Sequence, residues 1–108
     1  MHAFDVLGDP VRRRILELLG QASVHSGAIV EVISGEFGIG QSAVSQHLKV
    51  LRENGFANVT IDGTRRVYAL ETDGLREVDQ WLSPFRQFWA PKFAALATEV
   101  ARGRKQRD

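Results

Sequence analysis

Apolar residues in the first third of the chain recur with the period of an α-helix. The apolar positions between 11 and 19 fall on one helical face, directly after Asp9-Pro10. Aspartate at the N-cap and proline at the first helical position favour a helix start at this point. The pattern therefore predicts a helix over residues 10–20, a short helix over residues 3–8, and another helical stretch over residues 28–33.

Glycines separate these apolar stretches. Gly20 and Gly35 are expected to end the two longer helices, because glycine is common directly after the last turn of a helix. Gly38 and Gly40 then follow within three residues and predict a tight turn that uses positive φ angles.

A helix over residues 41–54 is predicted after this turn. Val44, Leu48 and Leu51 form its apolar stripe, and Asn54-Gly55 is a strong helix stop. The opposite face carries short polar side chains first and cations further along, namely Gln41, Ser42, Ser45, Gln46, Lys49 and Arg52. Glutamine suits adenine in the major groove and lysine or arginine suits phosphate, so this helix-turn-helix pattern predicts a DNA-reading helix.

Two basic features near this helix have competing interpretations. His47 lies next to the apolar stripe, which favours a partly buried packing residue over a contact to DNA phosphate. Arg12, Arg13 and Arg14 are consecutive, so they fan around their helix and form no single patch. A solvated helix face is the simpler interpretation of these arginines, and phosphate contact is the alternative.

A β-hairpin is predicted next. Residues 59–61 and 67–70 are rich in β-forming residues, and they flank Asp62-Gly63, a strong hairpin signal. The candidate tip residues are Thr64, Arg65 and Arg66. Because the tip follows a candidate DNA-reading helix, we expect it to contact the DNA backbone or minor groove; a merely polar hairpin tip is the alternative.

The last predicted element is long, helical and aromatic. An apolar stripe runs from Leu75 to Val100, and a second stripe lies beside it, although Pro84 and Pro91 favour two shorter helices over one rod. So small a chain has little core to cover such a face, which predicts a homodimer. The candidate interface residues are Phe4, Leu7, Trp81, Phe85, Phe88, Trp89, Phe93 and Leu96. A monomer and an apolar ligand pocket among these aromatic rings are the alternatives.

Composition narrows the classes of protein further. The 108 residues suit one domain, and the absence of cysteine excludes disulfide scaffolds and thiolate metal sites. Formal net charge is +1, but four of the basic residues lie in 102–108, so DNA binding must follow from local charge rather than overall basicity. The first residues do not have the pattern of a secretory signal, so a cytoplasmic protein is expected.

The motifs together resemble one bacterial family. Residues 5–16 and 41–52, with the run Ser45-Gln46-His47-Leu48, strongly resemble the ArsR-type winged helix-turn-helix repressors, and residues 62–68 are similar to the wing of that family. The resemblance implies a dimeric DNA-binding repressor. It places helix 41–54 in the major groove and the wing, residues 62–66, beside it.

The sequence departs from the metal-sensing members of this family. Their best-known metal site uses a cysteine pair on the helix before the recognition helix, and residues 29–33 hold no thiol at the matching place. Another site in the family uses aspartate and histidine of the last helix. Here Glu77 and Asp79 are present but no histidine follows His47, so neither a metal nor another cofactor is expected.

The fold expected from these observations is mainly α with a small β-hairpin, a winged helix-turn-helix over residues 1–101 with a basic disordered tail over 102–108. The expected function is a dimeric, sequence-specific transcriptional repressor that binds a pseudo-palindromic operator at the nucleoid. A winged-helix module that binds proteins instead of DNA is the alternative. An enzyme is not expected, because Gly38-Ile39-Gly40 lacks the rest of a phosphate-binding loop. The operator and any small-molecule inducer are not specified by the sequence.

Overall fold

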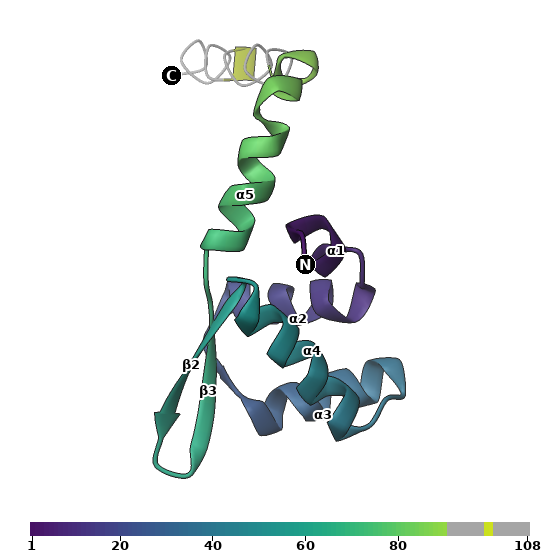
Figure 1. The fold of residues 1–108 in the computed structure, drawn as a ribbon, viewed down its shortest axis with the longest axis vertical. Coiled ribbons are helices and arrows are strands. Elements are labelled where there is room, and N and C mark those ends of the chain that lie inside the picture. The colour runs from purple at the N-terminus through teal and green to yellow at the C-terminus, as the bar shows by residue number, and fades with distance from the viewer. Residues whose placement is uncertain (91–98, 101–108) are drawn as a thin grey trace. The chain divides into compact units, whose positions relative to one another are not determined.

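The computed structural model describes residues 1–90 and 99–100 and divides the chain into two compact units, Met1–Val78 and Asp79–Asp108. The order of elements is α1 (Ala3–Leu7), α2 (Pro10–Gln21), β1 (Val24–His25), α3 (Ser26–Phe37), α4 (Gln41–Glu53), β2 (Ala57–Asp62), β3 (Arg65–Leu70), α5 (Asp73–Leu82) and the 3-10 helix η1 (Ser83–Phe88). In the first unit, α2, α3 and α4 lie together and the β2–β3 hairpin extends beside them (Figure 1). This architecture is the predicted winged helix-turn-helix.

The core of the first unit is built from the predicted apolar stripes. Its largest fully buried side chains are Phe56, Ile15, Ile29, Ile33, Leu51, Val6 and Val44. They come from each of the helices α1 to α4 and from the chain just before β2, so burial of these stripes holds the helices and the hairpin together. Within the described residues, no polar or charged residue is buried in this core.

The helix ends differ from the prediction at two glycines. Helix α2 continues through Gly20 to Gln21, and α3 continues through Gly35 to Phe37. Neither glycine takes a positive φ angle, whereas Gly38 does, at φ 67°, and its N–H donates to the Ser34 carbonyl at 3.0 Å. A glycine ends a helix where the chain turns left-handed, and of Gly20, Gly35 and Gly38 it is Gly38 that meets that condition. The expectation of positive φ is correct for Gly38 and wrong for Gly40, which lies at φ −84°.

The hairpin is longer than predicted and has a third strand beside it. Strands β2 and β3 are antiparallel with Asp62 opposite Arg65, so Gly63 and Thr64 form a two-residue turn. Strand β1 pairs with the other edge of β3, giving the order β1-β3-β2. The sequence predicts no strand over Val24–His25, because the pairing partner of this segment lies more than forty residues away and a local pattern does not reveal it.

A close contact joins the end of the hairpin to α5. Gly74 lies against the buried ring of Phe56, and a Cβ atom at position 74 would stand 2.5 Å from that ring. The Gly74 N–H donates to the Gly55 carbonyl at 2.9 Å. Leu75 and Val78 then pack on the core, so the first part of α5 belongs to the first unit.

The second unit begins within α5 and is described over residues 79–90 and 99–100. Helix α5 ends at Leu82, and Pro84 stands in the first turn of η1, so the predicted break at this proline is confirmed. Pro91, Phe93 and Leu96 lie outside the described residues, as does the predicted tail over 102–108. Within the described part of the chain, no helix has the length and apolar character needed to cross a membrane.

Candidate nucleic-acid interface

Helix α4 presents one buried and one exposed face. Val44, Leu48 and Leu51 are buried, as the stripe predicted, and the residues of the opposite face are all exposed: Gln41, Ser42, Ser45, Gln46, Lys49 and Arg52. Gly40 precedes the helix and offers no side chain to cap it. The first-turn N–H groups of α4 therefore remain available next to the short polar side chains.

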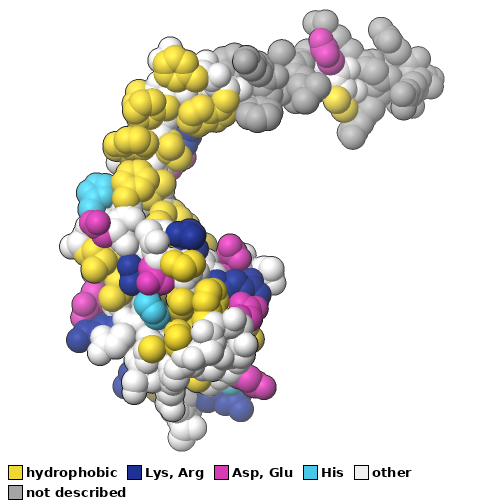
Figure 2. All heavy atoms as spheres, turned by 90° about the vertical axis from the view of Figure 1, so that its right-hand side faces the viewer, with side chains coloured by type: hydrophobic (Ala, Val, Ile, Leu, Met, Phe, Trp, Pro, Cys, Tyr) yellow, Lys and Arg dark blue, Asp and Glu magenta, His cyan; other side chains and the backbone are white. Residues whose placement is uncertain are grey.

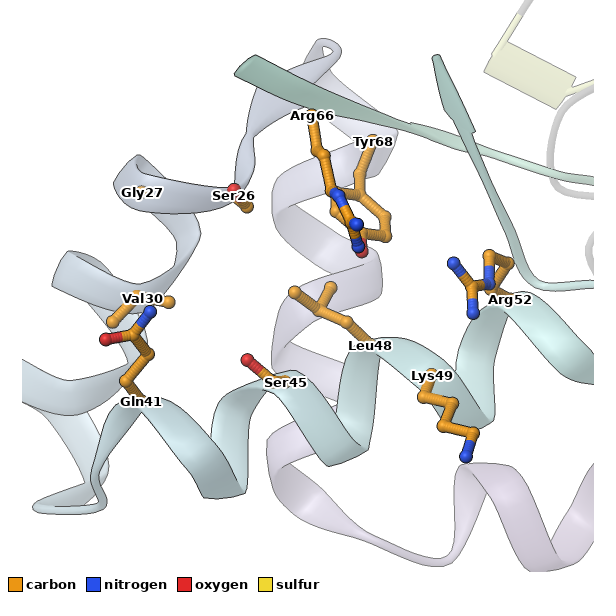
Figure 3. A pocket seen from close by; sticks show the side chains of 10 residues that line it. All are labelled: Ser26, Gly27, Val30, Gln41, Ser45, Leu48, Lys49, Arg52, Arg66 and Tyr68. Atoms are coloured by element: carbon orange, nitrogen blue, oxygen red, sulfur yellow. The ribbon is translucent and has the colours of Figure 1, made fainter. Parts of the chain in front are cut away.

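A cleft of about 500 Å³ lies between α4, the start of α3 and strand β3. Figure 3 shows Gln41, Ser45, Lys49 and Arg52 along α4, with Arg66 and Tyr68 reaching from β3 toward that helix. The cleft thus brings together residues of the predicted helix face and one arginine of the predicted tip. Ser42, Gln46, Thr64 and Arg65 do not line it.

Three cations border the cleft. Lys49 Nζ lies 4.0 Å from a carboxylate oxygen of Glu53, and both side chains are exposed, so water screens this pair. Among the described residues, the ion pairs do not include Arg52 or Arg66. Their guanidinium groups are therefore open to an anionic ligand at the cleft.

Arg65 and Arg66 occupy different faces of the hairpin. Successive residues of a strand point to opposite sides, and Arg66 shares its side with Tyr68, which lines the cleft. Arg66 stands opposite Ile61 in the register, whereas Arg65 stands opposite Asp62. Arg65 is therefore next to an acidic residue on the face away from the cleft, and the alternation of a regular strand already predicts opposite faces for the two arginines.

Sequence reasoning missed the other polar residues of the cleft, Ser26 and Tyr68. Ser26 opens α3 directly after β1, where His25 caps the helix by accepting a hydrogen bond from the Ala28 N–H at 3.3 Å. The signal for Tyr68 was present, because it stands two positions after Arg66 on the same side of the strand. For Ser26 there was no local signal, because β1 was itself missed.

The three consecutive arginines of α2 have partners inside the protein. Arg13 donates to the Leu7 carbonyl at 2.6 Å, and Arg14 donates to both carboxylate oxygens of Glu36 on α3, at 2.8 and 3.0 Å. Hydrogen bonding from Arg14 lowers the pKa of Glu36 below its usual range. Arg12 contacts both α1 and His47, and His47 is half-buried, which agrees with the packing interpretation of that histidine.

The residues predicted for self-association leave apolar surface uncovered. Phe4, Trp81, Phe85, Phe88 and Trp89 are all exposed, and Leu7 is half-buried. Figure 2 shows hydrophobic side chains gathered over α5 and η1. In the first unit, a shallow hollow of about 330 Å³ lies at Leu7, between α2, the end of β3 and the start of α5.

The positions of the family's metal sites hold other contacts here. Ile29 and Ile33 of α3 are buried in the core, and a carboxylate oxygen of Asp79 accepts a hydrogen bond from Arg86. Across residues 1–90 and 99–100, histidine, aspartate and glutamate side chains do not gather in groups of three or more that would suit a metal ion.

Known proteins share both the sequence and the fold. A family profile described as a helix-turn-helix domain matches residues 7–60. The HTH-type transcriptional regulator Rv2034 of Mycobacterium tuberculosis (strain ATCC 25618 / H37Rv) is 38% identical over 95 residues, 88% of this chain and 82% of that protein. The transcriptional repressor SdpR of Bacillus subtilis (strain 168) is 30% identical over 84 residues, 78% of this chain and 89% of that protein.

A solved structure shows that the fold is similar as well as the sequence. The crystal structure of a possible transcriptional regulator for arsenical resistance superposes with a TM-score of 0.65 and 29% identity, over 92% of this chain and 96% of that one. The winged helix-turn-helix architecture and these relatives agree with the motifs at residues 5–16 and 41–52. The chain belongs to the ArsR-type family of winged helix-turn-helix transcriptional regulators.

Proposed function

We propose that this protein represses transcription as a homodimer that binds a specific DNA sequence, with α4 in the major groove and the wing against the backbone or minor groove. The observation that carries the proposal is the polar outer face of α4, which continues into a cleft bordered by Lys49, Arg52 and Arg66. Phosphate contacts from such cations position a protein on the duplex, and contacts to base edges provide the specificity.

The first half of α4 is suited to base reading. In helix-turn-helix proteins the N-terminal residues of the recognition helix reach the base edges, and here that part carries Gln41, Ser42, Ser45 and Gln46. Glutamine forms two hydrogen bonds with adenine, and serine bonds to several bases. Lys49 and Arg52 stand one to two turns later, at the distance where the groove wall presents phosphates.

The two arginines of the wing are expected to contribute unequally. Arg66 lines the cleft beside α4, whereas Arg65 stands opposite Asp62 on the other face. We expect Arg66→Ala to weaken binding to all sequences and to reduce the salt slope by about 1, the change for one lost phosphate contact. Arg65→Ala is the matched control with a smaller effect, and Thr64 contributes at the turn. Equal losses for the two variants, measured by fluorescence anisotropy, would contradict this assignment.

Self-association follows from the uncovered aromatic side chains. We propose that a second copy covers the exposed rings of Phe4, Trp81, Phe85, Phe88 and Trp89, together with Leu7, Phe93 and Leu96. A dimer with two-fold symmetry presents two recognition helices about 34 Å apart, which selects a pseudo-palindromic operator. Sedimentation of the purified protein measures the mass directly.

Selection of DNA from a random pool by the purified chain tests the proposal most directly. We expect a pseudo-palindromic consensus, and an affinity that falls with salt on a log–log slope on the order of −5 to −9 for about three to five phosphates per subunit. Gln46→Ala is expected to relax preference at particular bases, in contrast to Arg66→Ala. A failure to enrich any sequence, with no salt-dependent binding, would overturn the proposal.

That same failure would favour the alternative function, a module that binds another protein. This alternative is supported by the net charge of −2 for residues 1–101. The ArsR-type family consists of transcriptional regulators rather than enzymes, so neither function includes catalysis. A DNA-binding repressor of this kind works in the cytoplasm at the nucleoid, and in this proposal it needs no metal or other cofactor.

A further inference from the structure

The Arg12 side chain joins two helices that have separate tasks in the proposed function. It is only 13% exposed. Its Nε donates to the Val6 carbonyl at 2.8 Å, and its Nη2 donates to the Asp5 carbonyl at 2.9 Å, so it caps the end of α1. Its Nη1 lies 3.4 Å from Nδ1 of His47, on α4.

Neighbouring arginines do not share this arrangement. Arg13 also caps α1, through the Leu7 carbonyl, but no hydrogen bond joins it to α4 in the described residues. Arg14 pairs with Glu17 and Glu36 instead. Arg12 is therefore the member of the triplet that contacts the recognition helix, and Arg13 provides a matched control that shares only the α1 contact.

The position of His47 explains why this contact matters for α4. His47 follows Ser45 and Gln46 directly and lies at the edge of the buried stripe. Because neighbouring residues on a helix are separated by about 100°, a rotation of α4 that moves His47 also turns Gln46 relative to the groove. The contact with Arg12 opposes that rotation from the side of α2.

We propose that Arg12 is a positioning residue for DNA binding, which holds α4 through His47 while it caps α1, so that the recognition helix keeps the angle needed at the duplex. This inference rests on the proposed function. It goes beyond that function by assigning a role to a residue that does not face the cleft, and by linking α1, with Phe4 and Leu7 of the proposed dimer interface, to α4.

The chemistry of the contact makes it depend on the protonation of His47. Arginine only donates hydrogen bonds, so Nδ1 of His47 must accept, with the proton of the ring on Nε2. A second proton on the ring would place two N–H groups and two positive charges against each other. Acidification is therefore expected to break the contact and weaken DNA binding.

The surroundings of His47 offer little that would compensate. Among the ion pairs of the described residues, Arg12 pairs with Asp9, whose Oδ2 lies 3.8 Å from Arg12 Nη1. Helix α1 presents backbone carbonyls, which Arg12 already occupies, and the Asp5 carboxylate accepts from the His2 N–H. Residues one turn away on α4 are uncharged: Ala43, Val44, Val50 and Leu51.

The test is the pH dependence of DNA affinity at constant ionic strength, measured with the full chain and its selected operator duplex. Affinities are compared from neutral to acidic pH, because a second proton on the His47 ring would remove the acceptor of this contact. We expect the affinity of the unchanged protein to fall on acidification by about fivefold more than that of His47→Gln, which keeps an acceptor that does not titrate.

A double-mutant cycle provides the second measurement. At the least acidic pH of that series, Arg12→Gln is expected to lower affinity about fivefold in the unchanged background and much less in a His47→Leu background. Arg13→Gln is expected to change the affinity equally in the unchanged and the His47→Leu backgrounds, because no hydrogen bond joins Arg13 to α4 in the described residues. Thermal unfolding and sedimentation show that each variant still folds and keeps the mass of the unchanged protein.

The outcomes separate the two proposals. An unchanged protein that binds no duplex at any pH overturns both. Binding with the same pH dependence in the unchanged protein and in His47→Gln overturns the positioning role alone. Affinity that rises on acidification through His47 also overturns it, because that sign belongs to a histidine that contacts a DNA phosphate.

Discussion

The two units differ in how much of their aromatic surface the fold buries. In residues 1–78, Phe56 is 0% exposed and Tyr68 is 6% exposed. In the described part of the second unit, Trp81 is 53% and Phe88 is 69% exposed. The first unit therefore buries two of its four aromatic side chains and leaves Phe4 and Phe37 40% and 38% exposed, whereas each described aromatic side chain of the second unit is at least 39% exposed.

This difference indicates where each unit obtains its stability. The first unit has a complete core and is expected to fold on that core alone. The second unit leaves large rings in water, which is costly and marks surfaces that bind another protein. The contrast supports the proposal that a second copy covers the aromatic residues, and it identifies the substitutions that separate folding from association.

The largest expected effect is the loss of a core ring. Phe56→Ala leaves a cavity and is expected to lower the free energy of unfolding by about 3–5 kcal/mol, measured by urea denaturation. Phe88→Ala is the matched control, since its ring is already exposed and little folding energy depends on it within one subunit. Similar losses in the two variants, measured at a protein concentration where the unchanged chain is monomeric, would remove the contrast between the units.

A smaller effect, on association, is expected in the second unit. The rings of Trp81 and Phe85 are tilted by 34° with centroids 4.7 Å apart, and large aromatic residues often dominate interfaces. Trp81→Ala is expected to weaken dimerisation by about 2 kcal/mol, roughly thirtyfold in the dissociation constant. Sedimentation equilibrium checks this, with Gln80→Ala as the control on the same helix. A dissociation constant that Trp81→Ala leaves unchanged would contradict the proposed interface.

The tight contact at Gly74 gives the next prediction. A Cβ atom there would stand 2.5 Å from the Phe56 ring, so Gly74→Ala is expected to destabilise the first unit by about 1–3 kcal/mol through overpacking. Gly20→Ala is the control, because no atom lies within 4 Å of a Cβ at that helical position. There we expect a gain of about 0.5–1 kcal/mol. Thermal unfolding would refute the overpacking account if both variants changed stability in the same direction.

The smallest effect concerns the exposed ion pair between α2 and α3. Arg14 holds the pKa of Glu36 below its usual range through hydrogen bonds, so the folded state favours the carboxylate. The pair therefore adds stability at neutral pH, and this contribution is lost as the pH falls through the lowered pKa of Glu36. Unfolding followed from neutral to acidic pH is expected to show a small loss that Glu36→Gln removes and Glu31→Gln, on the same helix, keeps.

Local signals predicted most of the fold. The start of α2 is specified by Asp9-Pro10, the end of α4 by Asn54-Gly55, and the turn of the hairpin by Asp62-Gly63. The elements next to these signals were predicted correctly. Strand β1 was missed because its hydrogen bonds go to β3, and the end of α3 was misplaced because glycine alone does not impose a left-handed turn.

The candidate site was predicted in part, for the same reason. Periodicity identified the outer face of α4, since burial of Val44 and Leu48 determines which side faces outward. Strand alternation predicts opposite faces for Arg65 and Arg66, and the structure adds that Arg65 stands opposite Asp62 while Arg66 lines the cleft. The partners of Arg12 required the packing of α1, α2 and α4 together, which no pattern in one segment contains.

The short strand β1 has a mechanical consequence. His25 is both the last residue of β1 and the N-cap of α3, so the sheet passes into the helix without a loop between them. Since β1 is hydrogen-bonded to β3, the wing and α3 share one stiff connection. If the wing is deflected by a bound duplex, we therefore expect the start of α3 to move with it.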